Sequence, residues 1–313
     1  MILACNIRYC IHDEIDKSEW NRCIEEADNG LIYARSFYLD IMAGKWDALI
    51  LNDYDAVMPL TWNRKYGFYY LYQPYFVPFL GVFGKKLTAL SVLDFLDAVP
   101  RKFKYWNIDL NEANCLMNKE NNLQFKITGR VNYHLNLHES YNELYAGYKK
   151  ACRRRIKKFS QQQVQIVREG NPADVIQFYR KHYESKYPKI FPDVYDKLKE
   201  STTICFEKDL AKIYLAKLPD GEITAAYLVL FDKNFVYLLI GGSSEKGKQT
   251  GSFYLITDAV IKDHAGSGKI LRFEGSDIPG IAIFNSQFGA YLSGYLHLNR
   301  NNLPFPVNML KRM

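Results

Sequence analysis

The chain has 313 residues, of which 48% are hydrophobic and 24% charged, and this length and composition predict two globular domains of roughly 150 residues each rather than a disordered chain. Its cysteines, at positions 5, 10, 23, 115, 152 and 205, form no CxxC pair and no Cys/His cluster, which argues against a disulfide framework or a zinc site and favours a reducing cytoplasm. The net charge of +7 comes from 41 Lys and Arg residues against 34 Asp and Glu residues, too small an excess to coat the surface for general nucleic-acid binding.

The first half of the sequence predicts the element order of an α/β domain. A strand near Leu3–Ile11 precedes two helices, at Lys17–Ala27 and Ala34–Ala43. Alternating apolar runs predict strands over residues 46–51, 56–62 and 68–73, then a helix at Thr88–Ala98 and strands over residues 104–110 and 126–137. The uncharged run from Gly67 to Gly84 contains two prolines and is shorter than the roughly 20 residues that span a bilayer, so no transmembrane helix is expected.

One segment in the middle of the chain carries the whole charge excess. Residues 149–158 read KKACRRRIKK, with seven basic residues and no acid. Apolar side chains recur at helical spacing through and before this segment, which predicts one amphipathic helix with a wide basic face; they are Leu144, Tyr148, Cys152, Ile156 and Phe159. Such a face either stays solvated or attracts an anion, and its place at a domain junction favours an anion site.

The second half gives clearer signals. Residues 163–169 alternate as in a strand, and two helices follow at Asp174–Lys186 and Val194–Ser201. Strands are predicted over residues 212–218, 223–231 and 235–242, and Asp220-Gly221 between the first two is a strong hairpin signal. A glycine-bearing loop over residues 241–251 leads to a helix from Ser252 to about His264, and the part from Gly247 to Ser252 is expected to be exposed. A strand over 270–275, a short helix around Pro279–Phe288 and a final strand pair from Tyr291 follow.

The two halves share this order of elements without obvious sequence identity, which predicts an internal duplication. A helix crossover between the last two main strands of each half makes that pair parallel, while the hairpins are antiparallel. The expected fold class is therefore α/β with mixed sheets. The expected domains are residues 1–137 and 161–313, joined by a basic connecting helix over residues 138–160.

This order of elements resembles the GNAT acyltransferase fold. The stretch YNELYAGYKKACRRRIKKFSQQQVQI is similar to the junction of the FemABX-like (BioF2-like) proteins, in which an RRxIKK-type basic helix precedes the second of two GNAT-like domains. The stretch FEGSDIPGIAIFNSQFGAYLSGY resembles the DF.G…G…FK..FG segment of the same family. The resemblance covers nearly the whole chain and implies tandem GNAT-like domains with acyltransferase activity.

The resemblance also implies a place for the acyl donor. In the GNAT fold the donor lies where the fourth and fifth strands part, and a [QR]xxGx[GA] loop holds its pyrophosphate at a helix N-terminus. The loop GKQTGS (247–252) matches this motif loosely. The implied donor is an acyl-CoA such as acetyl-CoA, without a metal, and the implied donor-binding residues are Gly241, Gly242, Ser243, Ser244, Gly247, Lys248, Thr250, Gly251 and Ser252.

Acyl transfer to an amine needs a base that takes the ammonium proton and donors that stabilise the tetrahedral oxyanion. Glu274 and Asp277 are the candidate bases, because both come at the end of the predicted fifth strand, and Tyr254 is a candidate proton donor. Each has a structural alternative, Glu274 as a surface carboxylate and Asp277 as a turn-forming residue. Ser243-Ser244 lacks the context of a nucleophile elbow, and the histidines form no triad spacing, so nothing predicts a hydrolase.

The basic segment supplies the candidate substrate-binding residues Arg153, Arg154, Lys157 and Lys158, which suit an anionic small molecule or cell-envelope precursor. Asn285 joins them, because the family has a Phe-Lys pair where this chain has Phe284-Asn285; that lysine handles a phosphorylated substrate, so its loss argues against UDP-muropeptide and tRNA-charged substrates. The leading hypothesis is a GNAT-type N-acyltransferase that acylates an amine. The alternatives are a tRNA-dependent aminoacyltransferase of the peptidoglycan-branching type and a non-catalytic binding protein that retains the fold.

Overall fold

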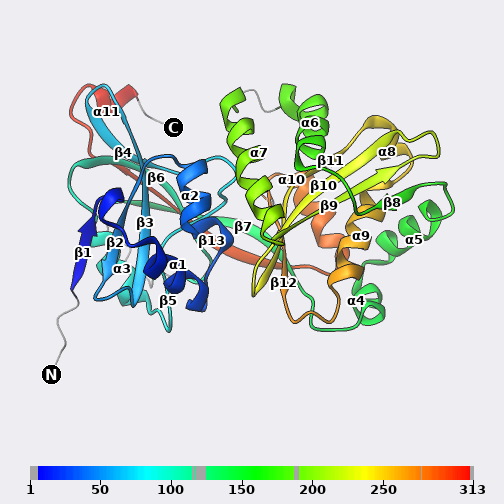
Figure 1. The fold of residues 1–313 in the computed structure, drawn as a ribbon, viewed down its shortest axis with the longest axis horizontal. Helices are drawn as coiled ribbons and strands as arrows, with labels where there is room; N and C mark the ends of the chain where they lie inside the picture. The colour runs from blue at the N-terminus through cyan, green and yellow to red at the C-terminus, as the bar shows by residue number, and fades with distance from the viewer. Residues whose placement is uncertain (1–5, 115, 117–124, 187–189, 276, 311–313) are drawn as a thin grey trace. The chain divides into compact units, whose positions relative to one another are not determined.

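A computed structural model describes residues 6–114, 116, 125–186, 190–275 and 277–310. The chain forms two compact units (Figure 1), the first made of Met1–Arg130 with Gly294–Met313 and the second of Val131–Ser293. The residues from Gly294 onward, which we expected in the second domain, thus lie in the first unit. Residues 138–160, which we expected between the domains, lie in the second unit.

The first unit is built on a mixed sheet with the strand order β1-β2-β3-β4-β6-β13. Its strands are β1 (Ile7–Cys10), β2 (Trp46–Leu51), β3 (Ala56–Lys65), β4 (Phe68–Tyr72), β6 (Phe103–Leu110) and β13 (Tyr291–Asn301), with the short β5 (Phe83–Gly84) on β3. Its helices are α1 (Lys17–Glu26), α2 (Ser36–Met42), α3 (Ala89–Asp97) and α11 (Val307–Leu310). β4 and β6 are parallel, and the other pairs are antiparallel.

The second unit is built on a sheet with the strand order β7-β12-β11-β10-β9-β8. Its strands are β7 (Lys126–Asn136), β8 (Gln165–Val167), β9 (Ala211–Lys217), β10 (Ile223–Phe231), β11 (Phe235–Ser243) and β12 (Ile270–Phe273). Its helices are α4 (Tyr141–Gly147), α5 (Lys150–Phe159), α6 (Pro172–Tyr183), α7 (Pro192–Glu207), α8 (Glu245–Gln249), α9 (Ser252–His264) and α10 (Pro279–Asn285). β11 and β12 are parallel, and the other pairs are antiparallel.

The two units repeat one strand topology. β1, β2, β3, β4 and β6 have the same order and relative directions as β8, β9, β10, β11 and β12. The strand that completes each sheet is exchanged: β7 follows β6 in the chain but pairs with β12, whereas β13 follows β12 but pairs with β6. Each of these completing pairs is antiparallel, so the last strand of one repeat closes the sheet of the other.

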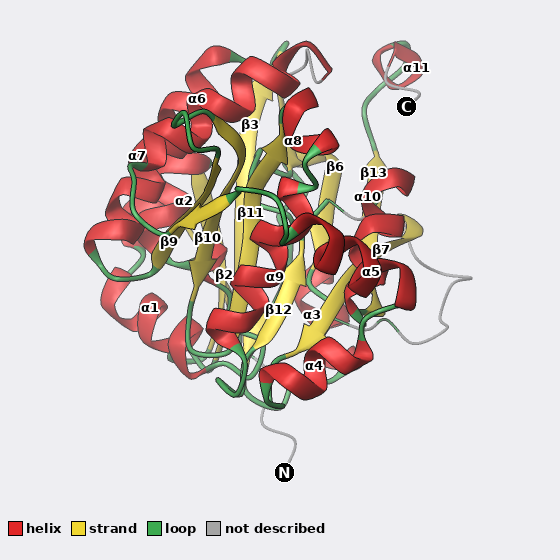
Figure 2. Cartoon of the chain, turned by 90° about the vertical axis from the view of Figure 1, so that its right-hand side faces the viewer, coloured by secondary structure: helices red, strands yellow, loops and turns green. Residues whose placement is uncertain are grey.

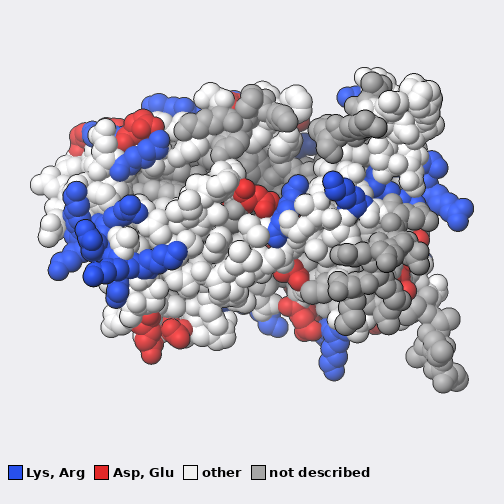
Figure 3. Space-filling model, turned by 180° about the vertical axis from the view of Figure 1, so that it is seen from behind, with Lys and Arg blue, Asp and Glu red and all other residues white. Residues whose placement is uncertain are grey.

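Residues 138–160, predicted as a single connecting helix, form the two helices α4 and α5. α4 ends at Gly147, because Tyr148 is extended (φ −64°, ψ 146°), and the N–H of Lys149 donates to the carbonyl of Gln287 at 2.9 Å. The apolar stripe is nevertheless buried as predicted at Leu144, Tyr148, Cys152 and Ile156. These side chains join one core cluster with strands β9–β12 and α9. Figure 2 shows α4, α5 and α9 on the same side of this sheet, and Figure 3 shows Lys and Arg side chains gathered over α5.

No helix in the described part of the chain combines the length and apolarity needed to cross a membrane.

The end of α9 holds a histidine whose titration should make stability depend on pH. Burial, followed by the charge of Lys212, lowers the pKa of His264 from 6.5 to about 4. Below pH 6.5 His264 is therefore protonated in the unfolded chain while it stays neutral in the folded chain. The free energy of unfolding should then fall as pH drops toward 4, by about 3 kcal/mol in all. Chemical denaturation from pH 7 to pH 4 should show a shallower fall in His264→Gln. His138→Gln, at an exposed position, is the control and should keep the wild-type slope; equal slopes in all three proteins would contradict this assignment.

Candidate functional site

The second unit has an opening between its two parallel strands. β11 and β12 pair only over Phe235–Tyr237 and Ile270–Arg272. β12 then ends at Phe273, whereas β11 continues to Ser243 and stays paired with β10 on its other side. Among the described residues no other strand pairs with this edge of β11. The backbone N–H and C=O groups along the edge are therefore placed to bind an extended ligand.

A bulge lies within this open edge. Leu228 pairs with Ile240 and Val229 pairs with Leu238, so Leu239 is an extra residue in β11. Such a residue twists the strand and turns its backbone groups out of the regular ladder, and bulges recur beside active sites for this reason. Backbone N–H groups turned in this way suit the stabilisation of an oxyanion.

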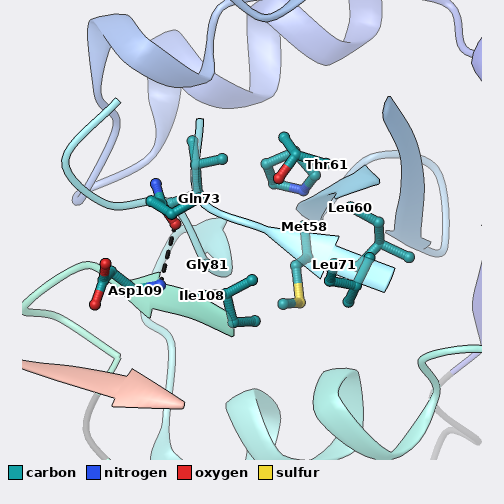
Figure 4. A pocket seen from close by; sticks show the side chains of 10 residues that line it. Met58, Leu60, Thr61, Leu71, Gln73, Gly81, Ile108 and Asp109 are labelled. Atoms are coloured by element: carbon teal, nitrogen blue, oxygen red, sulfur yellow. Dashed lines mark hydrogen bonds between the residues drawn. The ribbon is translucent and has the colours of Figure 1, made fainter. Parts of the chain in front are cut away.

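The first unit closes the corresponding place with its own chain. Leu80 pairs in parallel with Leu110 of β6, and its N–H donates to the carbonyl of Asp109 at 2.9 Å. Buried asparagines fix the segment that follows: Asn29 and Asn114 donate to the carbonyl of Val82 at 2.8 and 2.9 Å. The space that remains beside β3 and β6 is a small pocket lined by Met58, Leu60, Thr61, Leu71, Gln73, Gly81, Ile108 and Asp109 (Figure 4). An extended donor could enter it only by displacing this segment.

The predicted donor loop is more ordered and more buried than the sequence suggests. Residues Glu245–Gln249 form the short helix α8, and Ser244 caps it by accepting from the N–H of Gly247 at 3.1 Å. Gly242, Ser243, Ser244, Gly247, Gly251 and Ser252 are buried, whereas Lys248 is exposed and Gly241 and Thr250 are half-buried. The expectation of exposure from Gly247 to Ser252 is therefore wrong for Gly247, Gly251 and Ser252.

The loop glycines make close packing contacts. A Cβ on Gly251, whose φ is +64°, would lie 1.8 Å from the ring of Phe159, and one on Gly242 would lie 2.3 Å from the ring of Tyr183. Gly241 is packed in the same way against Tyr227. These glycines let aromatic side chains approach the backbone, which is a structural reason for them apart from phosphate binding.

The hydroxyl groups and lysines of the loop already have partners. Ser252 Oγ lies 2.7 Å from Thr250 Oγ1 and 2.8 Å from Thr224 Oγ1 of β10. Lys248 Nζ pairs with Glu245 at 2.5 Å. Lys246 Nζ pairs with Glu222 at 2.6 Å and Asp220 at 3.6 Å. Two lysines thus face three carboxylates, so the loop together with its ion-pair partners carries no net positive charge.

Glu274 lies in a buried polar cluster at the end of β12. Its side chain is 7% exposed, and Oε1 lies 3.6 Å from Nε of Arg272, itself a fully buried side chain. Asn132 Nδ2 donates to Glu274 Oε2 at 3.1 Å. The guanidinium of Arg272 also lies over the ring of Phe235, 4.9 Å from its centroid. Glu274 is therefore not the surface carboxylate of the structural alternative, because it shares a buried ion pair.

The other predicted catalytic and substrate residues lie in different surroundings. Asp277 is exposed and accepts from the N–H of Val131 at 3.2 Å, as a loop-shaping carboxylate does. Tyr254 is on the first turn of α9, where its Oη accepts from Arg155 at 2.7 Å. Asn285 is 3% exposed and donates to the carbonyl of Phe273, at 3.4 Å. Asn285 and Glu274 thus border the end of β12, whereas Tyr254 faces α5.

The cations of α5 form an exposed patch. Arg154, Arg155, Lys157 and Lys158 are exposed and Arg153 is half-buried. No carboxylate among the described residues pairs with any of the seven cations of residues 149–158. Seven like charges on one short stretch repel one another, and a bound anion would relieve that repulsion.

Three residues of the site were missed from the sequence. Tyr183 clamps the end of β11, since its Oη accepts from the N–H of Ser243 and donates to its carbonyl, both at 3.0 Å. Gln287 accepts from Arg155 at 2.8 Å, and Phe159 covers Gly251. Their contacts join segments 60 to more than 130 residues apart, so no local pattern marks them. Across the described residues, no three His, Cys, Asp or Glu side chains gather to hold a metal ion.

Comparison with known proteins shows that these elements have the GNAT fold. A family model described as an acetyltransferase (GNAT) domain matches residues 146–274, from the end of α4 to Glu274. The sequence has no significant match among curated proteins. The structure is similar to that of FemX, with a TM-score of 0.69 and 12% identity over 96% of this chain and 99% of that chain.

Two further solved structures are similar over nearly the whole chain. One is a conserved protein of unknown function from Bacteroides thetaiotaomicron, with a TM-score of 0.59 and 11% identity over 94% of this chain and 99% of that chain. The other is the C-terminal domain of a putative lysylphosphatidylglycerol synthetase from Agrobacterium fabrum, with a TM-score of 0.55 and 9% identity over 94% of each chain. At these identities the likeness shows a shared fold.

Proposed function

We propose that this chain, which has a FemX-like fold with a GNAT acyltransferase domain over residues 146–274, transfers an acyl group from an acyl-CoA-type donor, such as acetyl-CoA, to an amine. The observation that carries the proposal is the opening between β11 and β12, with its bulge at Leu239. The donor is assigned to the second unit, because Leu80 occupies the corresponding place in the first. The free thiols of Cys10, Cys23, Cys152 and Cys205 support the cytoplasm as the compartment.

The bound donor would supply an activated acyl carbonyl, and the chain's own groups would act on it. Backbone groups along Leu238–Ser243 would hold the donor extended, and N–H groups turned out at the bulge would stabilise the oxyanion that forms when the amine attacks. Glu274 is the proposed base, directly or through a water, since it is the buried carboxylate at the end of β12. Arg272 and Asn132 would hold that carboxylate in place.

The acceptor is proposed to be anionic, since Arg153, Arg154 and Lys157 of α5 lack carboxylate partners among the described residues. The same cations favour a second candidate function, aminoacyl transfer from a charged tRNA, whose backbone would also meet a positive surface. The two functions differ in the donor alone. A non-catalytic binding role remains the alternative to both.

The test is a transfer assay on the purified chain. Acetyl-CoA and longer acyl-CoAs would be offered with a panel of anionic amines, and thiol release and the acylated product would be followed together. Aminoacyl-tRNA would be offered in a parallel arm. Product formed from an acyl-CoA would support the proposal, and product formed from aminoacyl-tRNA alone would replace it with the second candidate. Binding of donors without any product would favour the non-catalytic role.

Tyr183→Phe should weaken donor binding through the end of β11. Its hydroxyl makes two hydrogen bonds to the backbone of Ser243, and losing it should cost about 1–2 kcal/mol of stability and raise the donor KM several-fold. Tyr141→Phe is a matched control, because that hydroxyl donates to Asp258 on α9 away from the opening. It should lower the melting temperature similarly and leave the donor KM unchanged. An equal rise of KM in both variants would show that Tyr183 has no particular role at the edge.

A further inference from the structure

The donor loop cannot neutralise a phosphorylated ligand by itself. Lys246 and Lys248 are already paired with Asp220, Glu222 and Glu245. A pyrophosphate placed there would meet three carboxylates, so positive charge from elsewhere would strengthen the binding that the backbone N–H groups of the loop provide. A donor of the CoA type, on which this inference rests through the proposed function, carries several phosphate charges.

The nearest source of such charge is α5, which packs against the beginning of α9. The ring of Phe159, the last residue of α5, covers the buried Gly251 that precedes α9. Arg155 Nη1 donates to Tyr254 Oη at 2.7 Å, on the first turn of α9. Lys158 Nζ lies 5.9 Å from the centroid of the Phe159 ring. The end of α5 and the start of α9 thus form one surface (Figure 2).

Helical geometry divides the cations of α5 between two flanks. Residues three and four apart share a side of a helix, so Lys158 follows Arg155 on the flank that contacts α9. Lys150, Arg153 and Lys157 follow one another at the same spacing toward the other flank, and Arg154 lies opposite the buried Cys152 and Ile156. The four residues predicted from the sequence therefore separate, since Lys158 shares the flank of Arg155 and the other three do not.

We infer that Arg155 and Lys158 form the site for the phosphate groups of the donor, in place of the lysines of the loop. The guanidinium of Arg155 is held by Tyr254 and Gln287, which keeps it beside the start of α9 without neutralising it. The exposed Lys158 supplies a charge-assisted hydrogen bond, which is stronger than a neutral one. The ligand class is a pyrophosphate-bearing nucleotide, with the pantetheine arm directed along the open edge of β11.

Calorimetric titration of the full chain tests this assignment with three probes: CoA, pantetheine, which has no phosphate, and inorganic pyrophosphate. The test variant is Arg155→Gln with Lys158→Gln. The matched control is Lys150→Gln with Lys157→Gln, which removes two charges from the same helix on its other flank. We expect the test variant to raise the Kd of CoA and of pyrophosphate at least tenfold. The control should change each Kd less than threefold, and neither variant should alter pantetheine binding.

The outcomes separate this inference from the proposed transfer reaction. Equal losses in the test variant and the control would overturn the inference, because they would show only the general field of the helix. Unchanged CoA binding in the test variant would overturn it too, even if acetyl-CoA proved to be the donor. A wild-type chain that binds neither CoA nor pyrophosphate would also refute it. If only the test variant loses CoA binding and the wild-type chain transfers no acyl group, the phosphate site is supported and the proposed transfer reaction is refuted.

Discussion

Replacing Glu274 with glutamine should lower the free energy of unfolding by about 3 kcal/mol, because it removes a buried carboxylate that pairs with the buried Arg272. The amide oxygen of the new glutamine can still accept the hydrogen bond from Asn132, so the loss of stability reports the loss of the carboxylate charge. If Glu274 is the base, kcat should also fall at least about a hundredfold, since an amide takes up no proton. Chemical denaturation measures the first effect, and initial rates at 15 °C, below the lowered melting temperature, measure the second.

Two comparisons interpret the Glu274 result. Glu245→Gln breaks an exposed pair with Lys248 and should change stability by less than about 1 kcal/mol. The double variant Glu274→Gln with Arg272→Met removes both charges and should recover most of the lost stability, since an apolar side chain can replace a buried pair at little cost. If stability falls and kcat holds, Glu274 positions Arg272 and the base must be sought elsewhere. If stability does not fall, the buried pair has no structural importance.

Gly251→Asp should destabilise the chain by about 3 kcal/mol, since the new side chain meets both a left-handed backbone and the ring of Phe159. Loss of donor binding in this variant would therefore not show that the loop binds the donor, because the lower stability could cause the same loss. Gly221→Asp is the matched control, because Gly221 also has a positive φ (+83°) but nothing within 4 Å of its Cβ position. It should cost only about 1 kcal/mol.

A second change identifies the source of the Gly251 effect. Phe159→Ala, made together with Gly251→Asp, removes the ring that the new carboxylate would strike and should restore about half of the lost stability, as measured by the melting temperature. No recovery would contradict the packing of Phe159 on Gly251. That contact also underlies the assignment of α5 to the donor loop.

Local patterns in the sequence predicted the elements of the second unit well. The strand over residues 223–231 and the helix over 252–264 have those bounds in the structure, because alternation and helical spacing are properties of neighbouring residues. α8 was missed, since Glu245–Gln249 contains a glycine and only one helical turn. The break at Tyr148 was missed because its cause, the carbonyl of Gln287, lies far along the chain.

The candidate site was less predictable, for the same physical reason. The sequence places Glu274 at the end of a strand, but its partner Asn132 comes from β7, and pairing between β7 and β12 follows from no local pattern. The sequence marks the glycines of the loop, but it does not show that Tyr183 and Phe159 pack on them. The basic segment was found from composition alone, whereas its division into two flanks needed the position of Tyr254.

The exchange of β7 and β13 bears on how the chain folds as it is synthesised. β6 cannot gain its outer neighbour until β13 has been made, after most of the chain has left the ribosome. Until then β6 is an exposed edge of the kind that promotes aggregation. Pairing across so many residues is also entropically slow. A cut between the repeats would leave each piece without the strand that completes its sheet, although each unit has its own core.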